Sequence, residues 1–418
     1  MRGLRRPTLD ESNRLFTAAV IGGGAVAGST ISVLFGGALI AGVARLFQGR
    51  IALPTNPSVR WIGACFAAFF FAEAISTVVN YTSPVSLLEG VVANLPFLGF
   101  LMIYGRLSLS SREDILSAVE FGSMAGSFGA LGYALIETMW FGYERAEGLA
   151  GNSGPFALVC TVLYGFNAVT AVRRRDRIGD IATLAMLAAG GAVLLSGMRS
   201  MWPILVLAPL IPLAVLRFRP RMGNPEKTTL ILAALLLIVI VASFAAVQAR
   251  VTMLMDDYDD VSVGEYDNSL GQRIRVWRAA AELVAERPLL GHGPAEAHVL
   301  MAARAADDGG AKGIAFTHAH NSILNAWMRS GILGAISALA ILLVPPWLGY
   351  RARKDEIGQI GYAMLTIVCM TYFIAGIFNA CFHHDIMDVL FIYSVITSSF
   401  LVFGNPSSPT VSVLIREE

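Results

Sequence analysis

Long apolar runs, each near the length needed to cross a lipid bilayer, recur along almost the whole chain. A transmembrane helix needs about 20 mostly apolar residues. Only 15% of the 418 residues are charged and 55% are hydrophobic, whereas a soluble domain carries nearer 25% charge. The sequence therefore predicts an all-α polytopic membrane protein with about twelve transmembrane helices. These helices are expected at 59–80, 84–105, 114–136, 154–172, 179–198, 200–217, 228–249, 323–349, 358–380 and 386–403, with two more inside 15–47, where glycines interrupt the run.

The distribution of arginine and lysine predicts the orientation. Alternate connections are rich in basic residues, as at 173–177 and 351–354, while the short loops between them hold only Arg145 and Arg199. Cytoplasmic loops carry the excess of positive charge in membrane proteins. Both termini are therefore expected in the cytoplasm. The chain then divides into nine helices in residues 1–249, one long outer loop at 250–322 and three helices in residues 323–418.

The long loop contains its own helix signal. It opens with an acidic run, Asp256, Asp257, Asp259 and Asp260, which is typical of a solvated segment. Ser269 and Gln272 then have the spacing of a capping box. Ile274, Trp277, Ala281 and Val284 recur at helical spacing before Pro288, and Gly291 and Gly293 follow in a turn. We expect an amphipathic helix at the membrane surface.

Composition excludes several classes of protein. A net charge of +1 argues against a nucleic-acid partner. The four cysteines lie in apolar runs without the spacing of a disulfide framework or a zinc site. We find no metal motif and no glycine-rich nucleotide loop, and we predict that the protein needs no metal or other cofactor.

The residues that could carry chemistry gather near the predicted outer face. Burying an ionisable group in a membrane costs about 2.5–3.5 kcal/mol at its centre on insertion scales, so such residues indicate function. The candidates are Arg199, Arg273, Arg275, His318, His320 and Asn321, the turn His383–His384–Asp385, and Glu73 and Glu89 in the outer halves of two helices.

Each candidate also has a plain structural interpretation. Arg199 could extend to the interface from a helix end, and Arg275 and Arg278 could form a solvated face. His292 and His298 are expected to be structural. For His383–His384–Asp385 we favour a polar turn over a metal site, because the ligand set is incomplete. Glu73 and Glu89 could satisfy each other or an arginine.

Taken together, the candidates predict a reaction. Arginines from two segments offer planar, bidentate donors suited to phosphate. A neutral histidine, with an ordinary pKa near 6.5, can accept a proton. Because a diphosphate is a good leaving group, one base and a cationic clamp suffice to move a sugar from a lipid diphosphate to a hydroxyl. The paired carboxylates of a glycosidase are not evident.

Three segments carry a family resemblance. SLGQRIRVW (269–277), RPLLGHGP (287–294) and HAHNSILNAWMRSGILG (318–334) occur in this order after SGMR (196–199). With the twelve helices and the single long loop, this pattern resembles the O-antigen ligase/polymerase superfamily of bacterial polysaccharide assembly.

The resemblance implies a metal-independent glycosyltransferase of the membrane-embedded C type in the inner membrane, with its active site facing the periplasm. It implies an undecaprenyl-diphosphate-linked glycan as donor, which reaches the site from among the membrane lipids. Arg199 and Arg273 would bind its diphosphate, and His320 would activate the acceptor hydroxyl. Trp277, Arg275, His318, Asn321, Glu73 and Glu89 complete the expected substrate site.

Two alternatives remain open. A ligase uses lipid A–core as acceptor, whereas a polymerase uses a second lipid-linked glycan; the single long outer loop favours the ligase. The other class is a polysaccharide or lipid transporter or flippase. Its sequence signature would be a pair of interrupted helices at corresponding positions in two halves of the chain. The helices within 15–47 are interrupted by glycines and the fourth helix contains Pro96, but we find no corresponding interruption in a second half.

Overall fold

The computed structural model describes residues 8–216, 255, 258, 268–307 and 316–405, and all regular structure within them is helical. The span expected at 228–249 and the acidic run Asp256, Asp257, Asp259 and Asp260 lie outside the described residues. The longer helices are α1 (Leu9–Val26), α2 (Thr30–Phe47), α3 (Pro57–Val79), α6 (Arg112–Leu135), α7 (Ser153–Arg173), α8 (Arg177–Leu195), α9 (Trp202–Val215), α11 (Ser269–Glu286), α12 (Pro294–Asp307), α13 (Ser322–Ala352), α14 (Glu356–Phe378) and α15 (Asp385–Phe403).

Nine helices of the described ranges are long and apolar enough to cross a membrane. This confirms a polytopic membrane protein. Each predicted span within those ranges has a helical counterpart, and the run 15–47 does divide into α1 and α2. Two further helices correspond to predicted spans but are not among these nine, because one is too charged and the other too short. α1 carries Asp10, Glu11 and Arg14 in its first turns, and η5 with α9 gives a shorter apolar helix at Arg199–Val215.

The span expected as one helix at 84–105 is instead a broken one. It consists of α4 (Pro84–Leu87), the π-helical turn η1 (Leu88–Val92), the 3-10 turn η2 (Leu95–Gly99) and α5 (Phe100–Leu107). Pro96 lies inside η2 and cannot donate a backbone hydrogen bond, which is consistent with the interruption. A second π-helical turn, η3 (Ile136–Trp140), ends α6.

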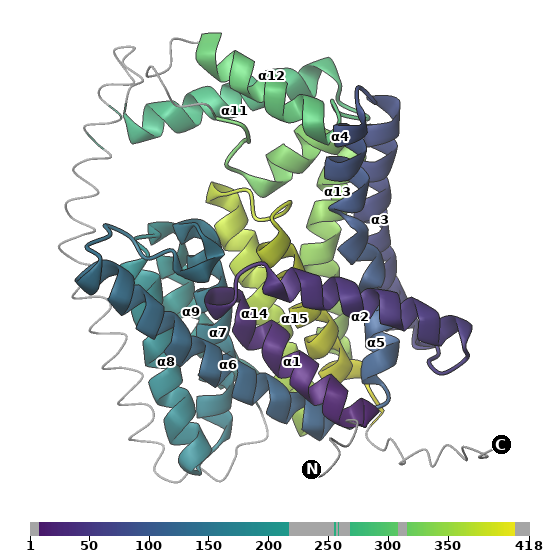
Figure 1. The fold of residues 1–418 in the computed structure, drawn as a ribbon, viewed down its shortest axis with the longest axis vertical. Coiled ribbons are helices and arrows are strands. Elements are labelled where there is room, and N and C mark those ends of the chain that lie inside the picture. The colour runs from purple at the N-terminus through teal and green to yellow at the C-terminus, as the bar shows by residue number, and fades with distance from the viewer. Residues whose placement is uncertain (1–7, 217–254, 256–257, 259–267, 308–315, 406–418) are drawn as a thin grey trace, which may run out of the picture.

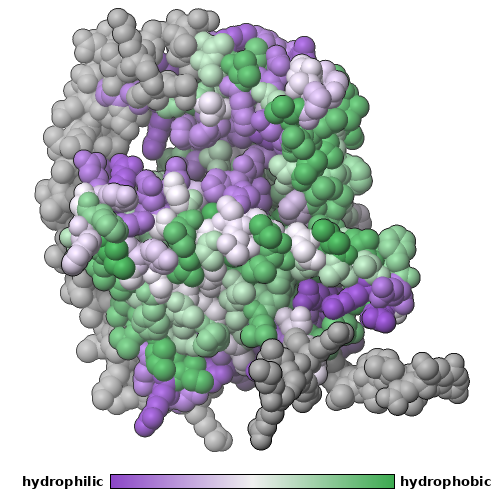
Figure 2. Space-filling view, viewed as in Figure 1, coloured by the Kyte–Doolittle hydropathy of each residue, from purple (hydrophilic) through white to green (hydrophobic). Residues whose placement is uncertain are grey.

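The helices form a bundle with a small cap at one end. In Figure 1, α3 and α13 stand side by side and α11 and α12 lie across that end of the bundle. Figure 2 shows a hydrophobic band over the bundle and hydrophilic residues gathered beneath the cap. The bundle core is apolar and aromatic, with Phe66, Phe391 and Tyr372 fully buried. A separate small core includes Val276, Ala280 and Leu283 of α11, Met301 of α12 and Met328 of α13.

The amphipathic loop helix is confirmed as α11, although its cap differs from the prediction. Asn268, not Ser269, is the N-cap, and its side-chain oxygen accepts a hydrogen bond from the Gly271 amide at 2.7 Å. Asn and Ser are equally good caps, so spacing alone did not separate these neighbours. The following helix α12 was not predicted, because the glycines before it were interpreted as the end of the folded segment.

Gly291 and Gly293 lie where the cap packs against a break in α13. Ser330 and Gly331 leave helical geometry, so carbonyls before them lose their helical partners. The segment 288–293 replaces them: the amides of His292 and Gly293 donate to the carbonyls of Met328 and Arg329 at 3.0 and 2.9 Å. Gly291 and Gly331 both have positive φ and lie so close that a Cβ on Gly291 would sit 2.7 Å from the Gly331 nitrogen. The segment 288–293, which carries the Pro-x-x-Gly-x-Gly pattern, is therefore a strip of backbone that docks against α13.

Candidate functional site

A pocket of about 630 Å³ lies between the cap and the bundle. α7, α11, α12 and α13 contribute to its wall, as do the segment before α13 and the turn between α14 and α15. Five of the six histidines of the chain line it, and no aspartate or glutamate of the described residues does. Its charged and titratable lining residues are Arg145, Arg273, Arg329, His298, His318, His320, His383 and His384. The pocket is thus suited to an anion.

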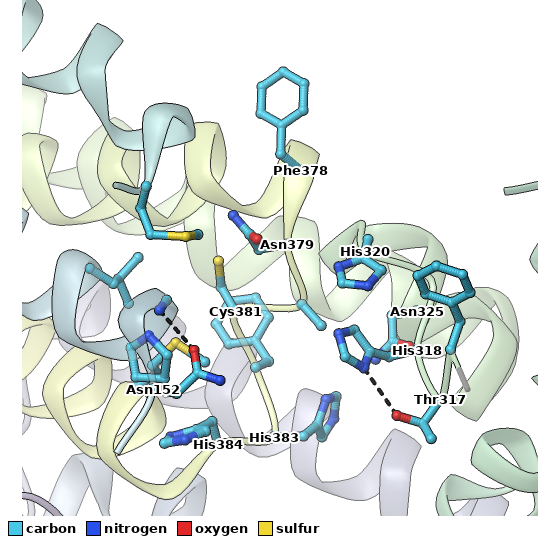
Figure 3. A pocket seen from close by; sticks show the side chains of 18 of the residues that line it. Asn152, Thr317, His318, His320, Asn325, Phe378, Asn379, Cys381, His383 and His384 are labelled. Carbon is cyan, nitrogen blue, oxygen red and sulfur yellow. Dashed lines mark hydrogen bonds between the residues drawn. The ribbon is translucent and has the colours of Figure 1, made fainter. Parts of the chain in front are cut away.

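His318 and His320 stand next to each other on one side of the pocket (Figure 3). Their ring centroids are 4.3 Å apart. In a helix, side chains two residues apart would point about 200° apart, but these two do not lie in a helix. Residues 316–321 precede the helix, and His320 has a φ of 45°, which turns its side chain back toward His318. A non-glycine residue in this region is strained and typical of functional sites.

The helix start after these histidines is the one predicted. Asn321 is the N-cap of α13, and its side-chain oxygen accepts hydrogen bonds from the amides of Ile323 and Leu324 at 3.1 and 3.0 Å. Asn325, one turn later, accepts from the Ala319 amide at 3.3 Å. The two asparagines therefore fix the backbone on both sides of His320.

Burial favours the neutral form of both histidines. Burial lowers the pKa of His320 to about 4, helped by the charges of His318 and Arg273. Burial also lowers the pKa of His318. A neutral imidazole is the form that can accept a proton.

Arg273 reaches the pocket from the first turns of α11. Its guanidinium lies over the Phe378 ring, 5.6 Å from the centroid, and the residue is exposed on the pocket side. Arg275 and Trp277 are not among the lining residues, and Trp277 packs against the small core of the cap. The structure thus brings together Arg273, His318 and His320, but it gives Trp277 a packing role.

Arg199 lies beside the pocket and not in its wall. It is exposed in the short turn η5 (Arg199–Met201), while its neighbours Met198 and Met201 do line the pocket. Ser200 accepts a hydrogen bond from Asn379, another lining residue, at 3.2 Å. The arginine that lines this side is Arg145, whose stem runs along Gly197.

The two candidate carboxylates have different surroundings. Glu73 of α3 is fully buried, and its Oε2 lies 3.1 Å from Nη2 of Arg329 in α13. The Ser330 hydroxyl donates to the other carboxylate oxygen of Glu73, and Nε2 of His383 lies 3.4 Å from it. Glu89 is exposed on η1. From the sequence, Glu73 could pair either with Glu89 or with an arginine. It pairs with an arginine.

His292 and His298 were both expected to be structural, and only His292 has a purely structural setting. It is buried, with its ring Nε2 2.7 Å from the Leu283 carbonyl oxygen. His298 lines the pocket, and its Nε2 lies 2.9 Å from Nη1 of Arg329. The sequence showed no difference between these two histidines, because the contact with Arg329 depends on the break in α13.

The turn between α14 and α15 enters the pocket. His383 has a φ of 76°, and its amide donates to both oxygens of Asp388 at 3.1 Å. Its ring stacks on Phe69. His384 lies on the opposite side of the pocket from His318 (Figure 3), 3.4 Å from Asp385. Among the described residues, no group of three or more histidines, cysteines or carboxylates is arranged to hold a metal ion.

Sequence reasoning missed Arg145, His298 and Arg329 as pocket residues. Arg329 was interpreted as part of an apolar helix, although an arginine inside a membrane-spanning segment is itself a signal of a buried partner. Arg145 entered the sequence analysis only as one of the few basic residues of the predicted outer loops. Nothing in the local sequence pairs it with a histidine segment more than a hundred residues later.

Residues 184–339 match a family model described as O-antigen ligase. The match begins within α8 and covers α9, the cap and the first half of α13, and so includes Arg199, Arg273, His320 and Arg329. Arg145 and the turn at His383 lie outside it. The chain has no significant match among curated proteins.

Proposed function

Since this chain belongs to the O-antigen ligase/polymerase superfamily, we propose that it transfers a glycan from undecaprenyl diphosphate to an acceptor hydroxyl at the periplasmic face of the bacterial inner membrane. The acceptor of choice is lipid A–core, which makes the protein an O-antigen ligase in lipopolysaccharide biosynthesis. The observation that carries the proposal is a pocket whose wall, in the part of the chain that the structure describes, holds three arginines and five histidines but no carboxylate.

The diphosphate of the donor would bind between arginines from opposite walls. Arg273 approaches from α11 in the cap and Arg145 from the bundle side, with Arg199 at the margin. Guanidinium groups bind phosphate oxygens through paired hydrogen bonds. As the bond from the anomeric carbon to phosphate breaks, these arginines would stabilise the charge that develops on the leaving diphosphate.

His320 would act as the base. The acceptor hydroxyl gives its proton to the neutral imidazole, its oxygen forms the new bond to the anomeric carbon, and the pair of electrons of the broken bond leaves with undecaprenyl diphosphate. The lowered pKa keeps the ring unprotonated at neutral pH, and the strained backbone at φ 45° directs it into the pocket. No carboxylate is required for this step, and among the described residues none lines the pocket.

The cap is proposed to face the periplasm. In Figure 1 it lies at one end of the bundle. The basic connections include Arg112, paired with Asp355 at 2.7 Å across two loops, and Arg173 and Arg174, paired with Glu120. An excess of arginine on one set of loops supports a cytoplasmic position for them, with the cap on the opposite side.

A polymerase that joins two lipid-linked glycans is the first alternative, because the same pocket serves either acceptor. A transporter or flippase is the second. Such proteins bind substrate near the middle of the membrane between two repeats, whereas this pocket lies at the end of the bundle next to the cap.

Reconstitution separates these functions. The purified protein in liposomes receives an undecaprenyl-diphosphate glycan and, in parallel, lipid A–core or a second portion of the same donor. A product on lipid A–core supports the ligase, and a lengthened lipid-linked glycan supports the polymerase. An Arg273→Ala protein, prepared identically, controls for contaminating enzymes. Donor movement across the bilayer without any product would overturn the proposal in favour of a transporter.

A further inference from the structure

A buried ion pair sits beneath the pocket. Nε and Nη2 of Arg329 lie 3.3 and 3.1 Å from Oε2 of Glu73, and both side chains are almost completely buried. Ser330 donates a further hydrogen bond to the same carboxylate. The carboxylate therefore compensates the charge of Arg329, which makes this arginine a poor second anchor for a diphosphate.

The remaining edge of Arg329 contacts His298 of α12. Nη1 of the guanidinium lies 2.9 Å from the ring Nε2 of His298. A guanidinium carries only hydrogen-bond donors, so this ring nitrogen must be the acceptor and cannot carry a proton. The proton of the neutral imidazole is therefore on Nδ1. Burial and the charge of Arg329 also lower the pKa of His298 to about 4, which excludes the doubly protonated ring at neutral pH.

This arrangement fixes what His298 can do for a ligand. Its Nε2 is occupied by Arg329, and no described residue is seen to accept a hydrogen bond from Nδ1. The His298 ring can therefore donate a hydrogen bond from Nδ1 to a ligand but cannot act as a base toward it. Because its charged neighbours Glu73 and Arg329 compensate each other, the group it suits best is an uncharged oxygen.

We propose that His298 is a fixed hydrogen-bond donor to a sugar hydroxyl, with its tautomer set by Glu73 and Arg329. This subsite rests on the proposed function, since it assumes that a glycan enters the pocket. His298 then contributes to the choice of sugar, while Arg273 and His320 carry out binding of the diphosphate and proton transfer.

The tautomer can be measured without substrate. In full-length protein labelled with 15N-histidine and embedded in nanodiscs, His298 is assigned by comparison with a His298→Gln protein. We expect a protonated Nδ1 and an unprotonated Nε2 at pH 7. The reverse tautomer, or a charged ring, would overturn the proposal whether or not transfer is ever observed.

Two substitutions separate a sugar contact from a structural role. Glutamine at 298 can still accept from Arg329 but has no donor at the place of Nδ1, whereas asparagine places its amide nearer that position. We expect His298→Gln to lower kcat/KM roughly tenfold, the scale of one lost hydrogen bond, and His298→Asn to lower it less. Wild-type kinetics in His298→Gln would mean that His298 serves only to hold Arg329.

Binding measurements identify the source of the hydroxyl and need no turnover. Dissociation constants are compared for undecaprenyl diphosphate and for the same lipid carrying its glycan. A preference for the glycan form that disappears in His298→Gln places the hydroxyl on the donor. An unchanged preference with a raised KM for the acceptor places it on the acceptor. Weaker binding of the sugar-free lipid would show a phosphate contact and overturn the proposal.

Discussion

The imidazole rings of His318 and His320 lie side by side, with their centroids 4.3 Å apart and their planes at 48°. Both rings line one pocket, so orientation alone does not decide which is the base. The family resemblance points to His320, and its strained backbone supports that choice. The distinction has to come from kinetics.

We expect His320→Ala to lose about 10²–10⁴-fold in turnover, the usual contribution of a positioned base, while the protein still inserts and binds donor. His318→Ala should lose much less, because it removes only a neighbour. Single-turnover rates with donor bound beforehand test this. Near-normal turnover in His320→Gln would contradict the assignment.

The pH dependence gives a second, independent prediction. Because the pKa of His320 is lowered to about 4, the neutral base persists well below pH 6.5, and kcat/KM should fall only as the pH drops through about 4. Since the charge of His318 contributes to that lowered pKa, His318→Gln should move the acid limb to higher pH. An acid limb that stays in place in this variant would show that another group titrates.

The arginines should differ in their importance for donor binding. Arg273→Ala should weaken the binding of undecaprenyl diphosphate sharply, because diphosphate charge is left uncompensated. Arg273→Lys should restore only part, since lysine keeps the charge and loses the planar pair of donors. Arg199→Ala is predicted to weaken binding as well, whereas Arg278→Ala on the exposed face of α11 provides the control. Equal affinities for all four proteins would rule out the clamp.

The buried pair of Glu73 and Arg329 should matter for stability. Removing one partner of such a pair typically costs about 3–5 kcal/mol, because the other charge stays buried without compensation. Glu73→Gln is therefore expected to lower the free energy of unfolding in detergent on that scale. Glu89→Gln is the matched control, as Glu89 is exposed on η1 and should leave stability unchanged. Equal stability of the two variants would mean that Glu73 is not needed to hold Arg329.

Gly291 and Gly151 offer a matched pair of substitutions. Both have a positive φ, 66° and 68°, so alanine costs about 1–2 kcal/mol at either position from backbone strain. At Gly151 nothing lies within 4 Å of the new Cβ, whereas at Gly291 it would meet the Arg329 carbonyl group at 2.5 Å. Gly291→Ala should therefore be clearly the less stable in thermal unfolding. A similar loss in both would show that the strip at 288–293 is not tightly docked.

Cysteine labelling tests the proposed orientation. Ala303 on α12 and Arg175 between α7 and α8 are both exposed. In cells whose outer membrane admits the reagent, an impermeant maleimide should label Ala303→Cys and spare Arg175→Cys until the inner membrane is permeabilised. The parent protein, with its four native cysteines, supplies the background. Early labelling at position 175 would reverse the topology.

Hydropathy was sufficient to predict the membrane-spanning helices of the described residues, because the bilayer imposes their length and every backbone group must be satisfied within the span. It could not predict the breaks. The span at 84–107 and the interruption at Ser330 depend on contacts with other segments, which periodicity does not record. α12 was missed because Gly291 and Gly293 looked like an end, whereas they are a close approach to α13.

For the site, sequence motifs predicted Arg273, His318 and His320, which all line the pocket although Arg273 comes from a different motif than the two histidines. Arg145 and His383 reach the pocket through the packing of distant helices, so no local spacing could join them to it. Arg329 carried the clearest unused signal, a charge deep in an apolar helix, but its partners could be identified only from the fold.

The strip at 288–293 also has a consequence for the order of assembly. At the break in α13 the Met328 carbonyl accepts from the His292 amide, and the Arg329 carbonyl accepts from the Gly293 amide and from the Ser76 hydroxyl of α3. An unsatisfied carbonyl costs several kcal/mol in hydrocarbon. Insertion of this helix alone therefore leaves it incomplete, and it becomes fully stable only when the chain that precedes it has folded back. Arg329 is next to this break, so the ion pair that joins α13 to α3 lies directly beside the hydrogen bonds that join α13 to the cap.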